Sequence, residues 1–196
     1  MFTLVPCAAG CGRGAVSGSN LCSVHAAEPE KDACRISDYM LSHQVIKDIN
    51  AAGLSFASID FANRAFYGCN FVRASFSMCL FPAAVMRMCF FDFAVFSNCD
   101  FSRGDLQFLS FAGAVIDNCS FESSELVHLN YSGAKISEST FNNSNLYNSR
   151  FINAKITDSD FFDCNVKKVS FINSERTNVS FKASNTAEAV FEKEPP

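Results

Sequence analysis

The sequence predicts an all-β solenoid, in which the chain winds into a rod of stacked coils. Two regularities predict it: every fifth residue from Phe56 to Phe191 is large and apolar, and the residue two places before it is small. The composition agrees, because 22 of the 196 residues are Phe, none is Trp, and 48% are hydrophobic. We therefore expect a repetitive core rather than disorder.

The five-residue column is nearly unbroken. Of its 28 positions, 17 are Phe and nine are Tyr, Leu, Ile, Met or Val, and only Arg176 and Thr186 depart. A step of five residues turns about 140° on an α-helix, which would scatter these side chains, and on a straight strand an odd step alternates faces. The chain must therefore turn about once every five residues, so that each large side chain points inward.

The small column lies two residues before each large one and contains six of the ten cysteines. These are Cys69, Cys79, Cys89, Cys99, Cys119 and Cys164. Residues two apart in an extended segment share a face, so this column also points inward, where a thiol behaves as a compact apolar group. A metal or redox ladder is the alternative interpretation. A stack of buried thiols is favoured, because reactivity requires exposure.

Turn residues follow each large residue by two places. Asn or Asp recurs there at positions such as Asn63, Asn98, Asn118, Asn143 and Asp158, and Gly at Gly68, Gly113 and Gly133. Such side chains hydrogen-bond nearby backbone or tolerate left-handed dihedral angles, and glycine adopts them freely. The spacing therefore predicts a tight turn between successive inward-facing segments.

Small residue, polar residue, Phe or Leu centre and two variable residues form a pattern that resembles the pentapeptide-repeat family. The resemblance implies a right-handed quadrilateral β-helix with twenty residues per coil, hence about seven coils for residues 56–191. The sequence agrees with four faces. Every twentieth residue from Phe61 to Phe181 is Phe, whereas the column that starts at Phe56 changes to Ile by Ile116.

The amino-terminal segment carries a possible zinc site. Its spacing, Cys7-x3-Cys11-x10-Cys22-x2-His25, suits a tetrahedral structural zinc, and four protein ligands leave no open position for a substrate water. Such a short segment cannot bury a core, so a metal would stabilise its fold. The alternative is that these thiols are incidental and reduced, on an unstructured leader.

We expect four parts of the chain. A short helix started by Ser37 belongs to the cap, whose first coil has bulky residues that plug the open end. The parts are the small zinc-binding module with its polar linker at 1–35, the cap at 36–55, the β-helix at 56–191 and a short tail at 192–196.

Outward positions are polar except between residues 78 and 95. The exceptions are Met78, Leu80, Val85, Met88, Phe90, Phe93 and Val95. An exposed apolar patch of that size marks an interface, so these residues are the candidate partner-binding set. The amino-terminal module folding back over them is one interpretation; a protein partner or a homodimer is the other.

Charge and motifs exclude several classes of function. The net charge of −4 is dispersed along the chain, which disfavours direct binding to nucleic acid or a membrane. The beginning of the chain lacks a signal-peptide pattern and no apolar run could span a membrane, so we expect a cytoplasmic protein. No catalytic set is evident, and we expect neither enzyme activity nor a small-molecule substrate.

Protein interaction or scaffolding is the leading functional interpretation, because a rod with a regular core leaves only its exterior to carry information. The resemblance implies one alternative, a DNA mimic that modulates type II topoisomerase (gyrase). Residues 56–196 carry 15 acidic and 12 basic residues, however, which is a weak excess for a mimic. A redox or metal-handling protein acting through its cysteines is the other alternative.

Overall fold

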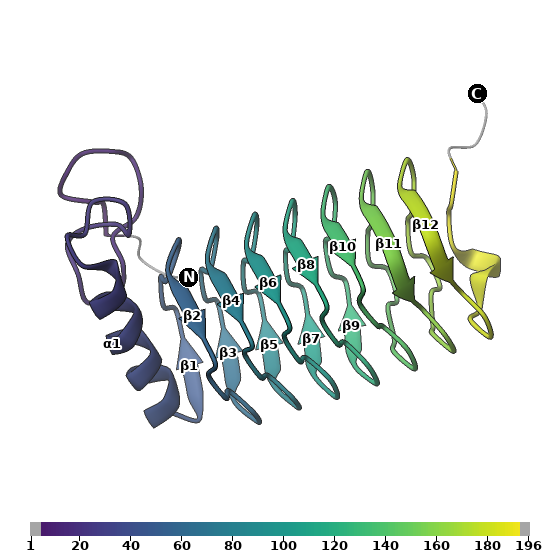
Figure 1. Cartoon of the computed structure of the whole chain (residues 1–196), viewed down its shortest axis with the longest axis horizontal. Coiled ribbons are helices and arrows are strands. Elements are labelled where there is room, and N and C mark those ends of the chain that lie inside the picture. Colours follow the sequence, from purple (N-terminus) through teal and green to yellow (C-terminus); the bar gives the residue numbers. More distant parts are fainter. Residues whose placement is uncertain (1–4, 193–196) are drawn as a thin grey trace.

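The computed structural model describes residues 5–192 and is a rod of parallel β coils with a helix at one end (Figure 1). Helix α1 (Pro29–Ser42) precedes twelve strands and a final 3-10 helix, Thr186–Glu188. The strands are β1 (Val45–Lys47), β2 (Ser55–Ala57), β3 (Ala65–Tyr67), β4 (Ser75–Ser77), β5 (Val85–Arg87), β6 (Val95–Ser97), β7 (Asp105–Gln107), β8 (Val115–Asp117), β9 (Glu125–Val127), β10 (Lys135–Ser137), β11 (Lys155–Asp160) and β12 (Glu175–Ser180). Within the described residues, no helix is long and apolar enough to cross a membrane.

The coil contains twenty residues, as predicted. Each strand pairs in parallel with the strand twenty residues later, for example Ile46 with Phe66 and Phe56 with Phe76. Two faces of the rod are sheets, ordered β1-β3-β5-β7-β9 and β2-β4-β6-β8-β10-β11-β12. The other two faces are joined by single parallel bridges, such as Asn70 with Phe90 and Leu80 with Asp100.

Four faces therefore follow one another along the chain, and we name them by their members. The β1 face is followed by the Phe71 face, then the β2 face, then the Phe61 face, after which the next coil begins. The turns between faces form the four long edges of the rod. A residue and its counterpart twenty positions later lie on adjacent coils of the same face or edge.

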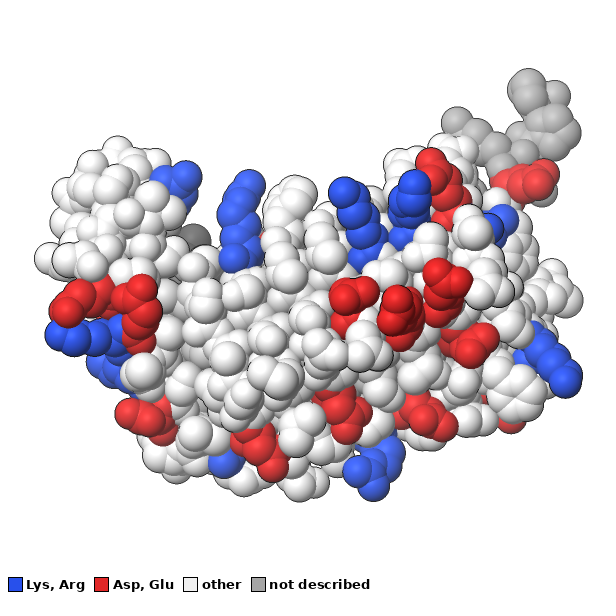
Figure 2. Space-filling model, in the orientation of Figure 1, with Lys and Arg blue, Asp and Glu red and all other residues white. Residues whose placement is uncertain are grey.

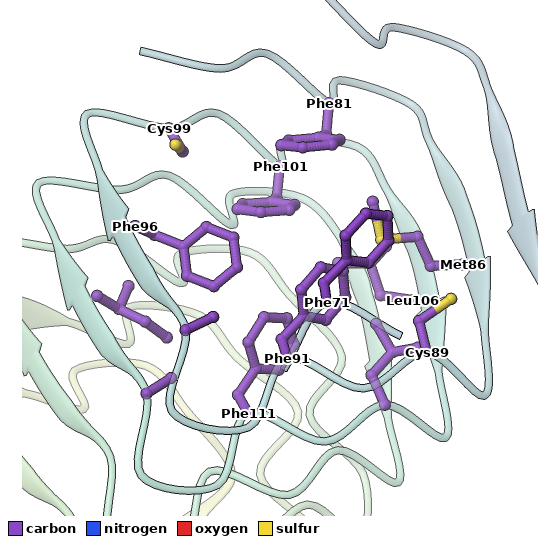
Figure 3. Packing of buried hydrophobic residues seen from close by; sticks show 14 of the residues in the cluster. Phe71, Phe81, Met86, Cys89, Phe91, Phe96, Cys99, Phe101, Leu106 and Phe111 are labelled. Atoms are coloured by element: carbon purple, nitrogen blue, oxygen red, sulfur yellow. The ribbon is translucent and has the colours of Figure 1, made fainter. Parts of the chain in front are cut away.

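Aromatic rings stack in columns inside the rod (Figure 3). In the Phe61 face, the ring centroids of Phe81 and Phe101 lie 4.7 Å apart with planes 2° from parallel. Neighbouring columns meet edge to face, as Phe96 and Phe101 do at 5.5 Å and 73°. Both arrangements are favourable for aromatic quadrupoles and add about 0.5–1.5 kcal/mol per pair to the free energy of burial.

The small column is buried, and its thiols are part of the core. All six solenoid cysteines expose 3% or less of their surface. The Cys79 Sγ donates a hydrogen bond to the Phe56 carbonyl at 3.6 Å, and other thiols in the column make the same contact one coil back. The interpretation of these residues as compact buried thiols agrees with the structure.

The helix at the amino-terminal end starts earlier than predicted. It begins at Pro29, so the expectation of a linker up to residue 35 and a start at Ser37 is wrong. Proline suits the first helical position, and Glu30 and Asp32 complement the positive end of the helix dipole. Ser37 is buried and donates its hydroxyl hydrogen to the Ala33 carbonyl at 2.8 Å. This local bond satisfies a side chain that the sequence pattern suggested as a cap.

The two exceptions in the large column lie near the opposite end. Arg176 places its guanidinium 5.0 Å from the Phe191 ring centroid and 5.8 Å from that of Phe171. It also donates a hydrogen bond to the Ser174 hydroxyl at 2.8 Å. The other exception, Thr186, begins the 3-10 helix. Polar centres at this end allow the aromatic core to meet solvent without exposing another large apolar side chain.

Tyr131 provides a test of how the core is packed. Its ring is fully buried between Phe111 and Phe151, at 5.1 and 4.7 Å, and its hydroxyl has no hydrogen-bond partner among the described residues. Burial raises the pKa of this hydroxyl well above its usual range. The unsatisfied group is expected to cost about 1–3 kcal/mol.

We therefore predict that Tyr131→Phe increases the free energy of unfolding by about 1–3 kcal/mol, because it removes an unpaired buried hydroxyl and keeps the ring stack. Denaturant unfolding monitored by circular dichroism measures this change. Tyr67→Phe, on the partly exposed exterior of β3, is the matched control and should change stability by less than about 0.5 kcal/mol. A destabilised Tyr131→Phe variant would contradict the packing described.

Candidate functional site

The amino-terminal module is built on a small hairpin. Pro6 and Gly14 form an antiparallel bridge, and the Cys7 amide donates to the Arg13 carbonyl at 2.9 Å. Gly10 and Gly12 have φ values of 68° and 76°, a left-handed conformation that glycine adopts without steric cost. The turn brings Cys11 back toward Cys7, four residues earlier in the chain.

The four predicted metal-ligating residues come together. The ligand atoms of Cys7, Cys11, Cys22 and His25 all lie within 4.8 Å of one another. The Cys11 and Cys22 sulfurs are 3.8 Å apart, and the His25 Nδ1 lies 3.6 Å from the Cys7 Sγ and 3.4 Å from the Cys22 Sγ. The cluster could therefore hold a metal ion.

The spacing of these atoms fits a tetrahedral zinc site. Zn–S bonds of about 2.3 Å and Zn–N bonds of about 2.0–2.1 Å place tetrahedral neighbours about 3.8 Å apart for two sulfurs and about 3.6 Å apart for sulfur and nitrogen. The measured separations match these values closely. The donor set also suits zinc, which prefers thiolate and imidazole ligands.

Backbone amides favour the thiolate form of the cluster. Chiefly through a hydrogen bond from the Arg13 amide, the pKa of the Cys11 thiol is lowered to about 6. The Cys22 amide donates to the Cys7 sulfur at 3.4 Å. Metal binding requires deprotonated cysteines, so amides directed at the sulfurs reduce the proton release that binding entails.

Asn50 attaches this module to the solenoid, and the sequence analysis did not identify it. Its side-chain amide donates to the Ala15 carbonyl at 2.6 Å, and its backbone amide donates to the Ser17 hydroxyl at 2.7 Å. Its side-chain oxygen accepts from Asn70, one coil further on, at 2.9 Å. Val16 is buried beside it in the main core. The recurrence of Asn at positions 50, 70 and 130 was the available signal.

The predicted partner-binding residues do not form one patch. They encircle the rod, because the seven positions between 78 and 95 occupy all four faces or the edges between them. Leu80 lies on the Phe61 face, Val85 on the β1 face, Phe90 on the Phe71 face and Val95 at the start of β6. The remaining residues, Met78, Met88 and Phe93, occupy three separate edges.

The module does not cover these side chains. Met78, Met88 and Phe93 expose 55%, 59% and 55% of their surface, so the expectation that the module folds back over the set is wrong. The module instead contacts the first coil at Asn50, on the Phe71 face. Val85 is only half-buried, whereas Leu80, Phe90 and Val95 are exposed.

Backbone geometry makes the exposed edge residues unusual. Nearly every edge position has φ between 48° and 66°, and Asn, Asp or Gly fills many of them, as the sequence predicts. Phe93 and Phe108 occupy the same left-handed conformation, with φ of 58° and 57°. A residue with a Cβ pays roughly 1–2 kcal/mol there, and each of these rings exposes 55% of its surface. Neither backbone preference nor core burial accounts for a phenylalanine at these turns.

Sequence comparison identifies the repeat. Residues 114–191 match the family model for the pentapeptide repeat region, so this segment is a pentapeptide-repeat domain. The match confirms the resemblance seen in the sequence, and the twenty-residue register continues without interruption back to β1. None of the curated proteins matches the chain.

Solved structures with similar folds are also pentapeptide repeat proteins. Rfr23 from the cyanobacterium Cyanothece 51142 is 16% identical with a TM-score of 0.45, covering 46% of this chain and 63% of its own. HetL from the cyanobacterium Nostoc sp. strain PCC 7120, a protein involved in heterocyst differentiation regulation, is 10% identical with a TM-score of 0.34, covering 81% and 95%. QnrB1, a plasmid-mediated fluoroquinolone resistance protein, is 17% identical with a TM-score of 0.28, covering 71% and 90%. This chain thus spans less than two thirds of the Rfr23 chain.

Proposed function

We propose that this protein is a non-enzymatic interaction scaffold, in which a rigid solenoid presents side chains along its edges to a protein partner. The observation that carries the proposal is the presence of exposed Met and Phe side chains at left-handed turns, where Asn or Gly recurs elsewhere in the rod. Such residues are costly to the free protein and gain burial only when another surface covers them. The family match is to a repeat region, which is consistent with a structural role.

The amino-terminal module serves this scaffold as a zinc-stabilised cap. Its four ligands come from the chain itself, which is the coordination of a structural site, since a catalytic site keeps a position for water. With α1, the module covers the end of the rod where β1 and β2 begin (Figure 1). A solenoid requires such a cap, because its terminal coil otherwise exposes unpaired backbone and apolar core.

One observation favours the alternative of a DNA mimic. Asp117, Glu138, Asp158 and Asp160 follow one another over three successive coils, on the β2 face and the edge beside it. This acidic run is short, and basic residues occupy the opposite edge of the same face. A gyrase supercoiling assay separates the two functions, because a scaffold leaves the reaction unchanged whereas a mimic inhibits it.

The alternative of redox chemistry through the cysteines has less support. The six solenoid thiols are buried, and burial raises the pKa of Cys79 and Cys164. Inaccessible thiols with a raised pKa are poor nucleophiles. The amino-terminal cysteines are better explained as metal ligands, as their mutual distances indicate.

We predict that purified protein contains about one equivalent of zinc, because four suitable ligands are already placed for it. Elemental analysis by mass spectrometry measures the content. Cys22→Ser should reduce it below about a tenth of an equivalent, whereas Cys34→Ser, an exposed thiol on α1 outside the cluster, should not. Zinc absent from the unmodified protein, or retained in full by Cys22→Ser, would contradict the assignment.

We also predict that cross-linking captures a protein partner through the exposed edges. The test variant combines Met78→Asn, Met88→Asn, Phe93→Asn and Phe108→Asn, which introduces the residue found at other edge turns. The control combines Asn98→Ala, Asn118→Ala, Asn143→Ala and Asn153→Ala at equivalent turns. Capture should be retained by the control and lost in the test variant, with the circular dichroism of both unchanged. Equal capture by the two variants, or no partner at all, would refute the scaffold function.

A further inference from the structure

One edge of the rod combines apolar and basic side chains. It runs between the Phe71 face and the β2 face, and we name it the Phe93 edge. Its members, in order along the rod, are Arg73, Phe93 with Val95, Val115 and Lys135. Val95, Val115 and Lys135 are register partners on β6, β8 and β10, so they lie on adjacent coils. The edge is therefore a continuous surface, and the residues that define it come from four successive coils.

Phe93 is held on this edge in an open orientation. The Arg73 guanidinium lies 5.0 Å from its ring centroid, which is a cation–π contact. Its other neighbour is Gly113, where an added Cβ would come within 2.7 Å of the ring. Arg73 and Gly113 thus hold the ring along the edge, and 55% of its surface stays exposed. Val95 and Val115, exposed to 45% and 37%, extend this apolar surface.

Charge on this side of the rod is mainly positive. Basic side chains stand along the upper edge in Figure 2, and acidic side chains gather on the front below it. Arg73 and Lys135 flank the apolar centre of the edge. The nearby carboxylate of Asp92 is already bonded to the Ser110 hydroxyl and the Ala112 amide. Lys155, beyond Lys135, is paired with Glu175 at 3.1 Å. Lys135 has no ion pair within the described part of the chain.

We propose that the Phe93 edge binds an extended acidic peptide segment of a protein partner, with an apolar side chain on Phe93, Val95 and Val115 and a carboxylate on Lys135. This inference rests on the proposed scaffold function and specifies its surface and partner. An apolar centre with positive ends complements a peptide that has an apolar residue between acidic ones. Nucleic acid fits less well, because its phosphates would approach the acidic run at Asp117 and Glu138 on the same face.

The coil spacing determines how such a peptide would be spaced. Adjacent coils are about 4.8 Å apart, so Lys135 lies roughly 10 Å along the rod from Phe93, and Arg73 roughly 5 Å in the other direction. An extended peptide rises about 3.3 Å per residue. The carboxylate for Lys135 should therefore follow the apolar residue by about three positions, and a second one for Arg73 should precede it by one or two.

Selection from a random twelve-residue peptide library displayed on phage, against the immobilised full chain, tests this inference. Enriched peptides should contain an aromatic or aliphatic residue with Asp or Glu about three positions later. The highest-ranking peptide is then synthesised with a fluorescent label, and its affinity is measured by fluorescence anisotropy. Phe93→Asn and, separately, Lys135→Glu should each weaken binding by about tenfold or more.

Phe108→Asn is the matched control. Phe108 has the same backbone conformation and the same exposure as Phe93, but it lies on the edge between the β1 and Phe71 faces, stacked on His128 at 4.9 Å. Its replacement should change the affinity by less than about twofold. Asparagine suits both turns, so neither variant should lose the fold, which circular dichroism verifies.

Several outcomes would overturn the inference. They are no enrichment of acidic-apolar peptides, unchanged affinity of Phe93→Asn, self-association of the chain in analytical ultracentrifugation that Phe93→Asn abolishes, and binding of a labelled oligonucleotide that Lys135→Glu abolishes. Partner capture that survives Phe93→Asn but is lost in Phe108→Asn would place the interaction on the other edge. That result would refute this inference and leave the scaffold function intact.

Discussion

The parallel register of twenty residues per coil is the constraint on which the rest of the structure depends. Because each residue lies over its counterpart in the next coil, identical side chains form columns, and a phenylalanine that fits once fits again. The register also fixes which residues share an edge. Both the aromatic core and the composition of the exterior therefore follow from one geometric rule.

A regular core separates stability from function in this protein. Inward positions admit only large apolar centres and small neighbours, so they carry little information about a partner. The edges are different, because their left-handed turns accept Asn or Gly at low cost, and any bulky residue there requires another reason. The metal cluster is also separate from the coils. It stabilises a module that attaches to the first coil through Asn50 and Val16.

Much of this could be predicted from the sequence, and the failures have physical causes. The five-residue period and the small column fix the coil, and the Cys and His spacing indicated a cluster that the structure brings together. The start of α1 was missed because Ser37 resembles a cap, although Pro29 and the acidic first turn are equally good signals. The apolar residues between 78 and 95 were taken for one patch because adjacency in sequence says nothing about faces until the turn of each five-residue segment is followed. Asn50 was missed because its partners lie 33 to 35 residues away in the chain.

The central claim is that the coils form one cooperative stack that is capped at the amino-terminal end and ends in polar centres at the other. Amide hydrogen exchange followed by mass spectrometry tests it most directly, because exchange protection reports the free energy of opening along the rod. The account predicts the slowest exchange across β5 to β10, continuous through residues 78–95, with faster exchange only toward β12 and the final 3-10 helix. Fast exchange at residues 78–95 between two protected regions would contradict it, since the core would then be interrupted where the structure has it continuous.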